Sequence, residues 1–337
     1  MVGLDNEEAS ALATFRGLCG EHGLLKRRDG MGEDDAPDGV TDERTLLRFL
    51  QANSMGPASA LEQYQQAIKF HGENNAMRMY DLMSVDDWEN TKCMYPHWTG
   101  RRDHLGQPIL MFDLEALTRE TLQSWRAIRN IPPATSADNP NMAQRILAHF
   151  DFYTRFVLPL CSAVHPSGPV TKCVYVVDCS CLSLRQSWDL RDFARQSSWV
   201  LATCFPETIY RIYACNVPSY VSTLWKILKP FLDPVTTDKI HFMYSTEALA
   251  GLSEVMDHDN IPSNFGGGFQ FESGMSPDFD SEIRQALKWT KAEPTGGLPP
   301  GPIKWIRTQS GEMKALATGT VDGAARKEEI ATLSPLD

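Results

Sequence analysis

The residues of this chain whose types and spacing could bind a charged group lie between 229 and 240. Asp233 is followed by Pro234, a pair that suits the N-cap and the first position of a short helical turn. Backbone N–H groups at such a helix start, together with Thr236 and Lys239, could hold a phosphate. The spacing alone favours a plainer interpretation, which is a capped turn beside a surface lysine.

The sequence lacks the common catalytic motifs. It contains no G-x-x-x-x-G-K-[ST] loop, no G-x-G-x-x-G turn that opens a helix after a strand, no H-E-x-x-H pair and no G-x-S-x-G elbow. The eight histidines are scattered without metal-ligand spacing, and the eight cysteines contain no C-x-x-C. We therefore interpret Cys173, Cys179 and Cys181 as small apolar packing residues.

Residues 217–231 have the spacing of an amphipathic helix. An apolar face recurs at helical intervals, and its members are Tyr220, Leu224, Trp225, Leu228 and Phe231. Two lysines and a serine form a narrow polar stripe beside it. Such a helix could be ordinary core packed against a sheet, which the spacing alone favours. It could also face a cavity on one side and a membrane interface on the other, with Trp225 and the lysines at the boundary.

Strands and helices alternate through the part of the chain that must position these residues. Strands are expected at 109–112, 173–178, 210–215 and 239–244. Helices are expected at about 141–161, 184–202 and 219–228. This alternation predicts an α/β fold with a largely parallel sheet. Helical patterns at 44–52 and 58–72 predict a small helical unit before the sheet, and a last helix is expected over 279–291.

Length and charge narrow the class of protein. The chain has 337 residues and a formal net charge of −11, which disfavours non-specific nucleic-acid binding because that needs Lys and Arg to displace counterions. No run approaches the roughly 20 apolar residues that cross a bilayer as a helix. The acidic N-terminal residues do not have the order of a signal peptide. We expect a cytoplasmic protein with reduced cysteines and no nucleic-acid partner.

Several ordered blocks of residues resemble the Sec14-like (CRAL-TRIO) family. Residues 205–218 read F-P-E-T-I-Y-R-I-Y-A-C-N-V-P, residues 229–240 read K-P-F-L-D-P-V-T-T-D-K-I, and residues 261–267 read I-P-S-N-F-G-G. The L-L-R-F-L run at 46–50 resembles the N-terminal helical subdomain of the same family. The resemblance covers about residues 42–272.

The resemblance implies a CRAL-TRIO fold. An N-terminal helical subdomain would precede a lipid-binding domain, in which a mixed, largely parallel sheet floors a hydrophobic cavity closed by a gate helix. The implied division is an N-terminal extension at 1–41, the helical subdomain at 42–90, the lipid-binding domain at 91–272 and a partly disordered C-terminal extension at 273–337. The gate would be the helix within 218–232.

The resemblance also implies a headgroup site. In Sec14-like proteins, contacts to an inositol headgroup and its phosphate fall on positions that match Glu207, Thr236 and Lys239. Lys239 would neutralise the phosphate, Thr236 would donate a hydrogen bond, and Glu207 would accept hydrogen bonds from inositol hydroxyls. No cofactor is implied.

Cavity-lining positions of the family match Leu110, Phe150, Cys173 and Tyr175. Sec14 itself has tyrosines or small hydroxyl residues at these positions, and it has a basic pair where this chain has Asn53-Ser54. The change at Asn53-Ser54 speaks against the inositide site, whereas the changes at the four cavity positions speak against a choline phospholipid and suggest a more apolar cavity.

Three functions stay open. The first is a monomeric carrier that takes one phospholipid, above all phosphatidylinositol, into a closed cavity and exchanges it during transient membrane contact. The second is a dedicated carrier of a sterol, a terpenoid or another hydrophobic intermediate. The third is an enzyme that acts on a cavity-bound hydrophobic substrate with Cys173, Tyr175 and Asp178, although no nucleophile–base pair or metal site is visible.

Overall fold

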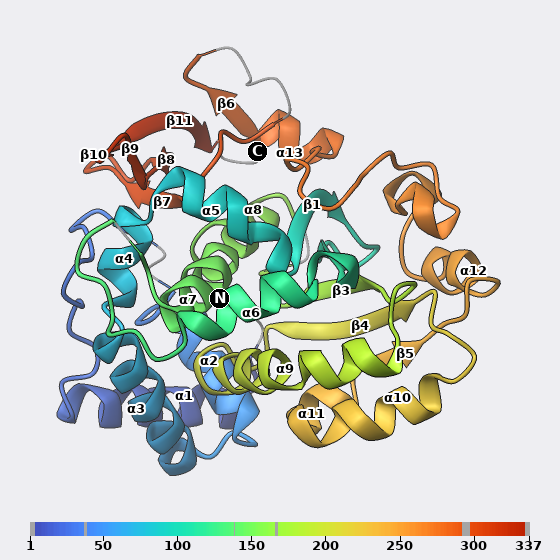
Figure 1. Ribbon diagram of the computed structural model, residues 1–337. Coiled ribbons are helices and arrows are strands. Elements are labelled where there is room, and N and C mark those ends of the chain that lie inside the picture. The colour runs from blue at the N-terminus through green and yellow to red at the C-terminus, as the bar shows by residue number, and fades with distance from the viewer. Residues whose placement is uncertain (1–3, 37–38, 138, 166–167, 292–296, 334–337) are drawn as a thin grey trace.

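A five-stranded sheet forms the centre of the protein (Figure 1). The computed structural model describes residues 4–36, 39–137, 139–165, 168–291 and 297–333. The strands are β1 (His97–Arg102), β2 (Pro108–Asp113), β3 (Cys173–Asp178), β4 (Ile209–Cys215) and β5 (Ile240–Phe242), and they follow this order across the sheet. Only β1 and β2 pair in the antiparallel sense among these neighbours, so the prediction of an α/β fold with a largely parallel sheet is confirmed.

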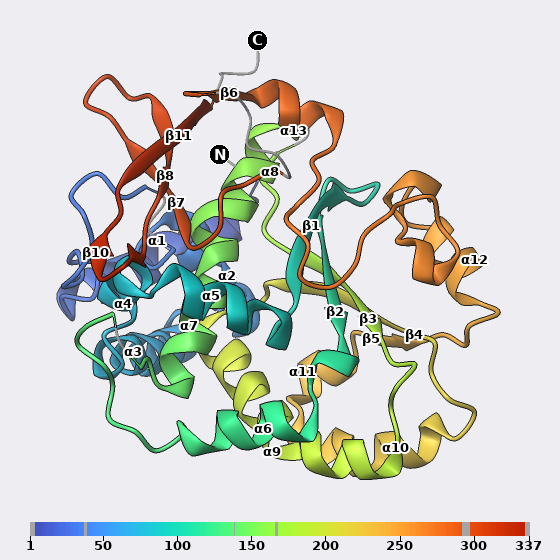
Figure 2. The same ribbon diagram turned by 45° about the horizontal axis from the view of Figure 1, so that its top comes forward.

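Successive residues of the strands face opposite sides of this sheet. Ile109, Val174 and Val176 lie on one side, where they pack in a cluster with the segment that contains α12 (Ala248–Ser253). Leu110 and Tyr175 lie on the other side, in a larger cluster with the helices. Figure 2 shows α12 and α9 (Leu184–Cys204) on the two sides of the strands. The second side is the one that carries the apolar cavity described below.

The N-terminal third is helical, as the sequence predicts. It contains α1 (Asn6–Glu21), α2 (Glu43–Ala52), α3 (Pro57–Glu73), α4 (Ala76–Leu82), α5 (Val85–Thr91) and η1 (Lys92–Met94). Asp42 caps α2 because its carboxylate accepts a hydrogen bond from the backbone N–H of Thr45 at 3.1 Å. Helix α3 packs against both α1 and α9, so these helices support the wall of the central domain.

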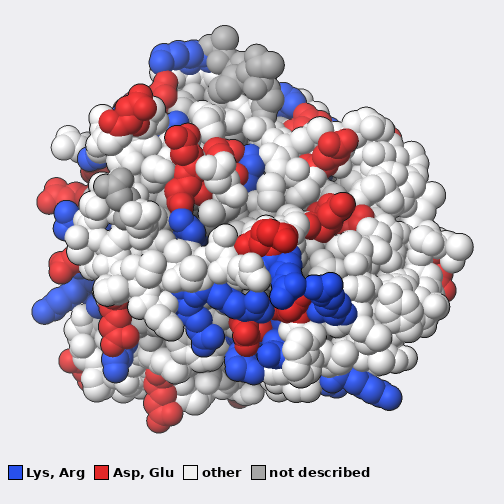
Figure 3. Space-filling view, viewed as in Figure 1, with Lys and Arg blue, Asp and Glu red and all other residues white. Residues whose placement is uncertain are grey.

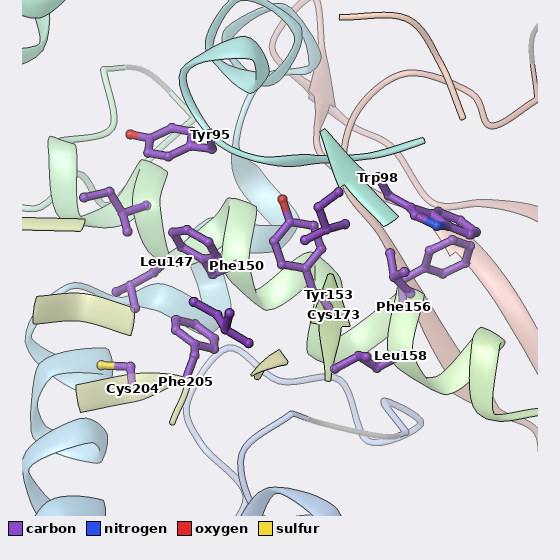
Figure 4. Close-up of a cluster of buried hydrophobic side chains, with 14 of the residues drawn as sticks. Tyr95, Trp98, Leu147, Phe150, Tyr153, Phe156, Leu158, Cys173, Cys204 and Phe205 are labelled. Atoms are coloured by element: carbon purple, nitrogen blue, oxygen red, sulfur yellow. The ribbon is translucent and has the colours of Figure 1, made fainter. Parts of the chain in front are cut away.

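The helix predicted at 141–161 exists but changes its winding in the middle. It consists of α7 (Met142–Phe152), the π-helical segment η3 (Tyr153–Val157) and α8 (Leu158–Ala163). Pro159 follows the segment and has no N–H to donate to the carbonyl of Arg155, which removes one bond of the regular α-helical ladder. Figure 4 shows Phe150, Tyr153 and Phe156 directed into one apolar cluster.

Shorter helices connect the strands. They are η2 (Leu114–Ala116), α6 (Arg119–Ala127), α10 (Val221–Leu228), η4 (Lys229–Phe231), α11 (Pro234–Thr237), η5 (His258–Asn260) and η6 (Ser263–Phe265). The gate helix predicted within 218–232 corresponds to α10 and η4. The sequence analysis did not predict α6.

The prediction of a helix over 279–291 is wrong in its second half. α13 (Ser281–Ala286) ends where β6 (Leu287–Trp289) begins, because Leu287 pairs with Leu333 of the last strand and strand pairing outweighs local helical preference.

A second sheet, which was not predicted from the sequence, has the order β6-β11-β8-β7. Its other strands are β7 (Ile303–Arg307), β8 (Met313–Ala317) and β11 (Glu328–Leu333). The short strands β9 (Thr320–Val321) and β10 (Ala324–Ala325) form a hairpin beside it. Residues 292–296 and 334–337 of the predicted C-terminal extension lie outside the described residues.

A buried group of charges joins both extensions to the central domain. The Asp35 carboxylate accepts hydrogen bonds from Arg155 Nη2 at 2.6 Å and from Lys304 Nζ at 2.8 Å. Lys304 Nζ also contacts the Asp81 carboxylate at 2.5 Å. Asp35, Arg155 and Lys304 are almost completely buried. Three segments that lie far apart in the sequence, around residues 35, 155 and 304, are therefore held at one point.

Replacement of Asp35 by alanine should destabilise the protein strongly. Removing one partner of a buried ion pair leaves the other charges without compensation, which costs about 3–5 kcal/mol of unfolding free energy. Urea denaturation of Asp35→Ala measures this loss, with Asp34→Ala as the matched control because Asp34 is exposed. Equal unfolding free energies for the two variants would contradict this account of the junction.

Candidate functional site

An apolar cavity lies between the central sheet, α9 and α10. Its volume is about 220 Å³ and almost every atom that lines it is apolar. Tyr175, Val177 and Ile212 of the strands contribute one wall, and α9 and α10 contribute the walls facing it. Since the lining offers few hydrogen-bonding groups, the space suits an apolar molecule better than a polar one.

The four residues predicted to line the cavity divide into two pairs. Phe150 and Tyr175 belong to its lining. Leu110 and Cys173 are fully buried in the adjoining core and are not part of the lining. Figure 4 shows Cys173 and Phe150 in one apolar cluster, so the two pairs adjoin.

Helix α9 supplies lining residues that the sequence analysis did not name. Leu190, Phe193 and Leu201 of this helix all face the cavity. Their spacing of three and eight residues places them on one side of a helix, so the sequence did contain a signal for them.

The predicted gate residues occupy different positions around the apolar cavity. Leu224 is completely buried, and Leu224, Trp225 and Leu228 all line the cavity. The Trp225 ring meets the Phe242 ring of β5 edge to face, with centroids 5.2 Å apart. Tyr220 and Phe231 are not lining residues.

These two outer residues connect α10 and η4 to α9 and its flanking loop. The Tyr220 hydroxyl donates to the carbonyl of Leu182 at 3.4 Å. The Phe231 ring lies under the Arg195 guanidinium, whose central carbon is 4.7 Å from the ring centroid. These two contacts add to the direct packing of α10 and η4 on α9.

A second, more polar cavity adjoins the first. It has a volume of about 160 Å³, and Glu207, Thr236 and Lys239 are all among its lining residues. It shares Leu201, Ile209 and Thr236 with the apolar cavity. The structure therefore brings the three predicted headgroup residues together at one end of the apolar space.

Two lysines surround the carboxylate of Glu207. Lys172 Nζ lies 2.7 Å from Glu207 Oε2, and Lys239 Nζ lies 3.4 Å from the same oxygen. Burial alone would raise the pKa of Glu207, but the hydrogen bond and charge of Lys172 and then those of Lys239 outweigh burial and lower it. Lys172 was not predicted, because it lies 35 residues before Glu207 and only the pairing of β3 with β4 brings the two together.

The prediction that the backbone N–H groups at the start of α11 are free is wrong for Thr236. Asp233 accepts hydrogen bonds from the backbone N–H of Thr236 at 2.9 Å and from its hydroxyl at 3.2 Å. Because the capping carboxylate already occupies these donors, the positive group that lines this cavity is the side chain of Lys239, and Lys172 contacts Glu207 beside it.

Asn53, one of the two residues that match the basic pair of Sec14, pairs with the amide of Gln63. The side-chain N–H group of Asn53 donates to the carbonyl of Phe49 at 2.9 Å and also to the amide oxygen of Gln63. Gln63 in turn donates to the carbonyl of Ala202 at 2.8 Å and lines the polar cavity. This wall of the cavity therefore carries amides and no charge.

The three residues considered for catalysis do not form one site. Burial raises the pKa values of the Cys173 thiol and the Tyr175 hydroxyl, which keeps both groups protonated. The Asp178 carboxylate accepts hydrogen bonds from Ser180, Asn216 and Asn264. Cys173 and Asp178 lie at opposite ends of β3, about 17 Å apart at the usual rise of a strand.

The described part of the chain lacks both a membrane-spanning helix and a group of metal ligands. Its helices include none that is long and apolar enough to cross a membrane. Its His, Cys, Asp and Glu side chains include no group of three or more that could hold a metal ion.

Comparison with known proteins identifies the family. The model of the CRAL/TRIO domain matches residues 91–267, which is more than half of the chain. The chain belongs to the CRAL/TRIO domain family. The predicted family and fold are therefore confirmed.

Relatives and a solved structure agree with this membership. The chain is 25% identical to the SEC14 cytosolic factor of Candida glabrata over 242 residues, which cover 72% of this chain and 76% of that protein. It is 23% identical to the phosphatidylinositol/phosphatidylcholine transfer protein SFH9 of Arabidopsis thaliana over 268 residues, which cover 78% of this chain and 42% of that protein. The crystal structure of Sfh5 matches the fold with a TM-score of 0.54 and 13% identity, covering 74% of this chain and 85% of that chain.

Filling the apolar cavity should exclude its occupant. Ala194 of α9 lines the cavity, so a tryptophan at this position would extend into the space that an apolar ligand needs. We expect Ala194→Trp to lose at least tenfold in affinity for a fluorescent phospholipid, measured by titration, while the exposed control Ala58→Trp keeps the affinity of the unaltered chain. Equal affinities for both variants would show that the ligand binds elsewhere.

Proposed function

We propose that this protein is a lipid carrier that takes one phospholipid, phosphatidylinositol above all, into the apolar cavity and exchanges it at membranes. The observation that carries the proposal is the junction of an almost wholly apolar cavity with a smaller polar cavity lined by Glu207 and Lys239, with Lys172 bonded to the same glutamate. The names of its relatives, which include cytosolic factors and phosphatidylinositol/phosphatidylcholine transfer proteins, support a cytosolic carrier.

The physical reason for such a cavity is the cost of moving an acyl chain through water. Each buried CH₂ is stabilised by about 0.8 kcal/mol relative to water, so a lipid leaves a bilayer only for a similarly apolar place. The lining from the strands, α9 and α10 offers such a place. Movement of α10 away from α9 while the protein touches the membrane would open the cavity without exposing the acyl chains.

The polar cavity would receive the headgroup. Lys239 and Lys172 would neutralise the phosphate, and Glu207 would accept hydrogen bonds from inositol hydroxyls. In this structure the Glu207 carboxylate contacts both lysines, so an arriving phosphate would compete with this carboxylate for them.

This exchange involves no bond chemistry. Cys173 and Tyr175 are buried and protonated, and Asp178 is engaged in three hydrogen bonds. We therefore propose a carrier and not an enzyme.

A second candidate is a carrier of a sterol or a terpenoid. The nearly complete lack of polar atoms in the lining of the larger cavity favours it. Such a ligand would fill the apolar cavity and leave the lysines of the polar cavity without a partner from the ligand.

Replacement of Lys239 by alanine tests the proposed headgroup site. The change removes one of the two cations that face the phosphate, so transfer of phosphatidylinositol between vesicles should fall at least tenfold. Binding of a neutral sterol should not change, because its contacts would be apolar. The transfer rate measured with radiolabelled phosphatidylinositol checks the first expectation.

Lys69→Ala is the matched control, because Lys69 is an exposed lysine of α3. The melting temperature of both variants shows whether they are folded. A folded Lys239→Ala variant that transfers phosphatidylinositol at the rate of the unaltered chain would refute the assigned headgroup site.

A further inference from the structure

The outer side of α9 carries a stripe of exposed aromatic, apolar and basic residues. Leu184, Trp188, Arg191, Arg195 and Trp199 follow one another at spacings of three or four residues, which places them on one face of the helix. Trp188 is 58% exposed and Leu184 is 51% exposed, the former being the highest value among the large exposed apolar side chains of the described residues. Exposure of this kind in a soluble domain marks an interaction surface.

The same helix lines the ligand cavity with its opposite side. Leu190, Phe193 and Leu201 face the cavity, roughly across the helix from the outer stripe. Only the width of α9 therefore separates the exposed stripe from the apolar cavity. A partner bound at the stripe would lie on the other side of this helix from the cavity.

The charge of this face differs from that of the whole chain. Residues 119–129, 184–204 and 220–232, which contain α6, α9 and α10, hold eight Lys or Arg and three Asp or Glu, whereas the chain holds 32 against 43. Figure 3 shows the basic side chains gathered over α6 and α9. The pair of Asp192 with Arg126, 3.6 Å apart, removes one charge of each sign and leaves the basic excess unchanged. This face therefore offers a positive surface on an otherwise acidic protein.

Aromatic and basic side chains are combined on this face. The Arg191 guanidinium lies over the Trp188 ring, 3.9 Å from its centroid. Tryptophan favours the boundary between lipid headgroups and acyl chains, and nearby Lys and Arg attract acidic lipids. A negatively charged bilayer fits both properties, because it offers an apolar layer just beneath a layer of anionic groups.

We propose that the face formed by the outer stripe of α9 and the basic residues of α6 and α10 docks on an anionic membrane surface. Trp188 and Leu184 enter the headgroup layer, and the arginines contact the acidic lipids. The inference deepens and rests on the proposed carrier function, because it names the surface at which the carrier meets its donor and acceptor membranes.

Docking on this face also reaches the gate. Arg195 belongs to the stripe, and its guanidinium covers Phe231 of η4. In addition, Ser198 Oγ accepts a hydrogen bond from the backbone N–H of Asp233 at 2.8 Å, just after the gate segment. An anionic lipid that binds Arg195 competes with the contact to Phe231 and loosens the gate where the membrane is.

Co-sedimentation with vesicles tests the docking surface. The unaltered chain should bind vesicles of phosphatidylcholine with 30 mol% phosphatidylserine at least tenfold more tightly than vesicles of phosphatidylcholine alone, and the difference should shrink as salt is raised. The variants Leu184→Ala/Trp188→Ala and Arg185→Glu/Arg195→Glu should each lose at least tenfold in affinity for the anionic vesicles.

Matched controls lie in the C-terminal region, in or beside β6 and in β9. Lys288→Glu/Lys291→Glu makes the same change of charge at two exposed lysines, and Val321→Ala removes an exposed apolar side chain. These controls should bind like the unaltered chain. The proposal would be overturned if the chain bound neutral and anionic vesicles equally, if it bound neither, or if both α9 variants bound fully. Binding to neither kind of vesicle is the result expected if this face binds a protein partner instead.

The Lys239→Ala variant separates this proposal from the proposed function. Its side chain lies in the polar cavity and not on the stripe, so it should still bind anionic vesicles. Loss of transfer with intact vesicle binding in Lys239→Ala, and loss of vesicle binding with intact ligand affinity in the α9 variants, would support both. If only one of these two results is obtained, transfer alone decides the headgroup site and vesicle binding alone decides the docking surface.

Discussion

The apolar space between the central sheet and α10 is the constraint on which the rest of this structure depends. Tyr175, Val177 and Ile212 would face water if α10 moved away, and exposed apolar surface costs about 25 cal/mol per Å². The protein must therefore keep the gate closed or hold an apolar molecule there. α10 packs along α9, and the buried Leu224, the edge-to-face pair of Trp225 with Phe242 and the ring of Phe231 under Arg195 contribute to this closure. In the proposed exchange α10 would leave α9 at a membrane, where the cost of exposing the apolar lining is small.

The extensions at both ends of the chain support the side of the cavity opposite α10. The pair of Asp35 with Arg155 and Lys304 attaches the N-terminal segment and β7 to the π-helical segment η3, and the Trp305 indole N–H donates to the carbonyl of Phe156 at 3.0 Å. η3 directly continues α7, which supplies Phe150 to the cavity. Buried ion pairs contribute little net stability when compared with apolar packing, but they are costly to break and so they specify one arrangement.

Periodicity and family motifs predicted most of the central domain. The strands and α9 follow from alternation and helical spacing, and the F-P-E and K-P-F-L-D-P runs place Glu207 and Lys239 in one cavity. The features that sequence reasoning missed depend on tertiary contacts. Lys172 reaches Glu207 only because β3 and β4 are neighbours, and the N–H of Thr236 is occupied because Asp233 turns back to cap its own helix. The C-terminal strands are short and their partners lie up to 46 residues away, so local patterns could not predict them.

Native mass spectrometry of the purified chain tests the central claim most directly, because a closed apolar cavity should retain its ligand through purification. The account predicts one phospholipid bound per chain, with phosphatidylinositol as the main species after extraction and fragmentation. A chain that carries only a sterol or terpenoid would contradict the assignment of the polar cavity to a phosphorylated headgroup. A chain that is empty even after incubation with phosphatidylinositol vesicles would contradict the proposal that the protein is a phospholipid carrier.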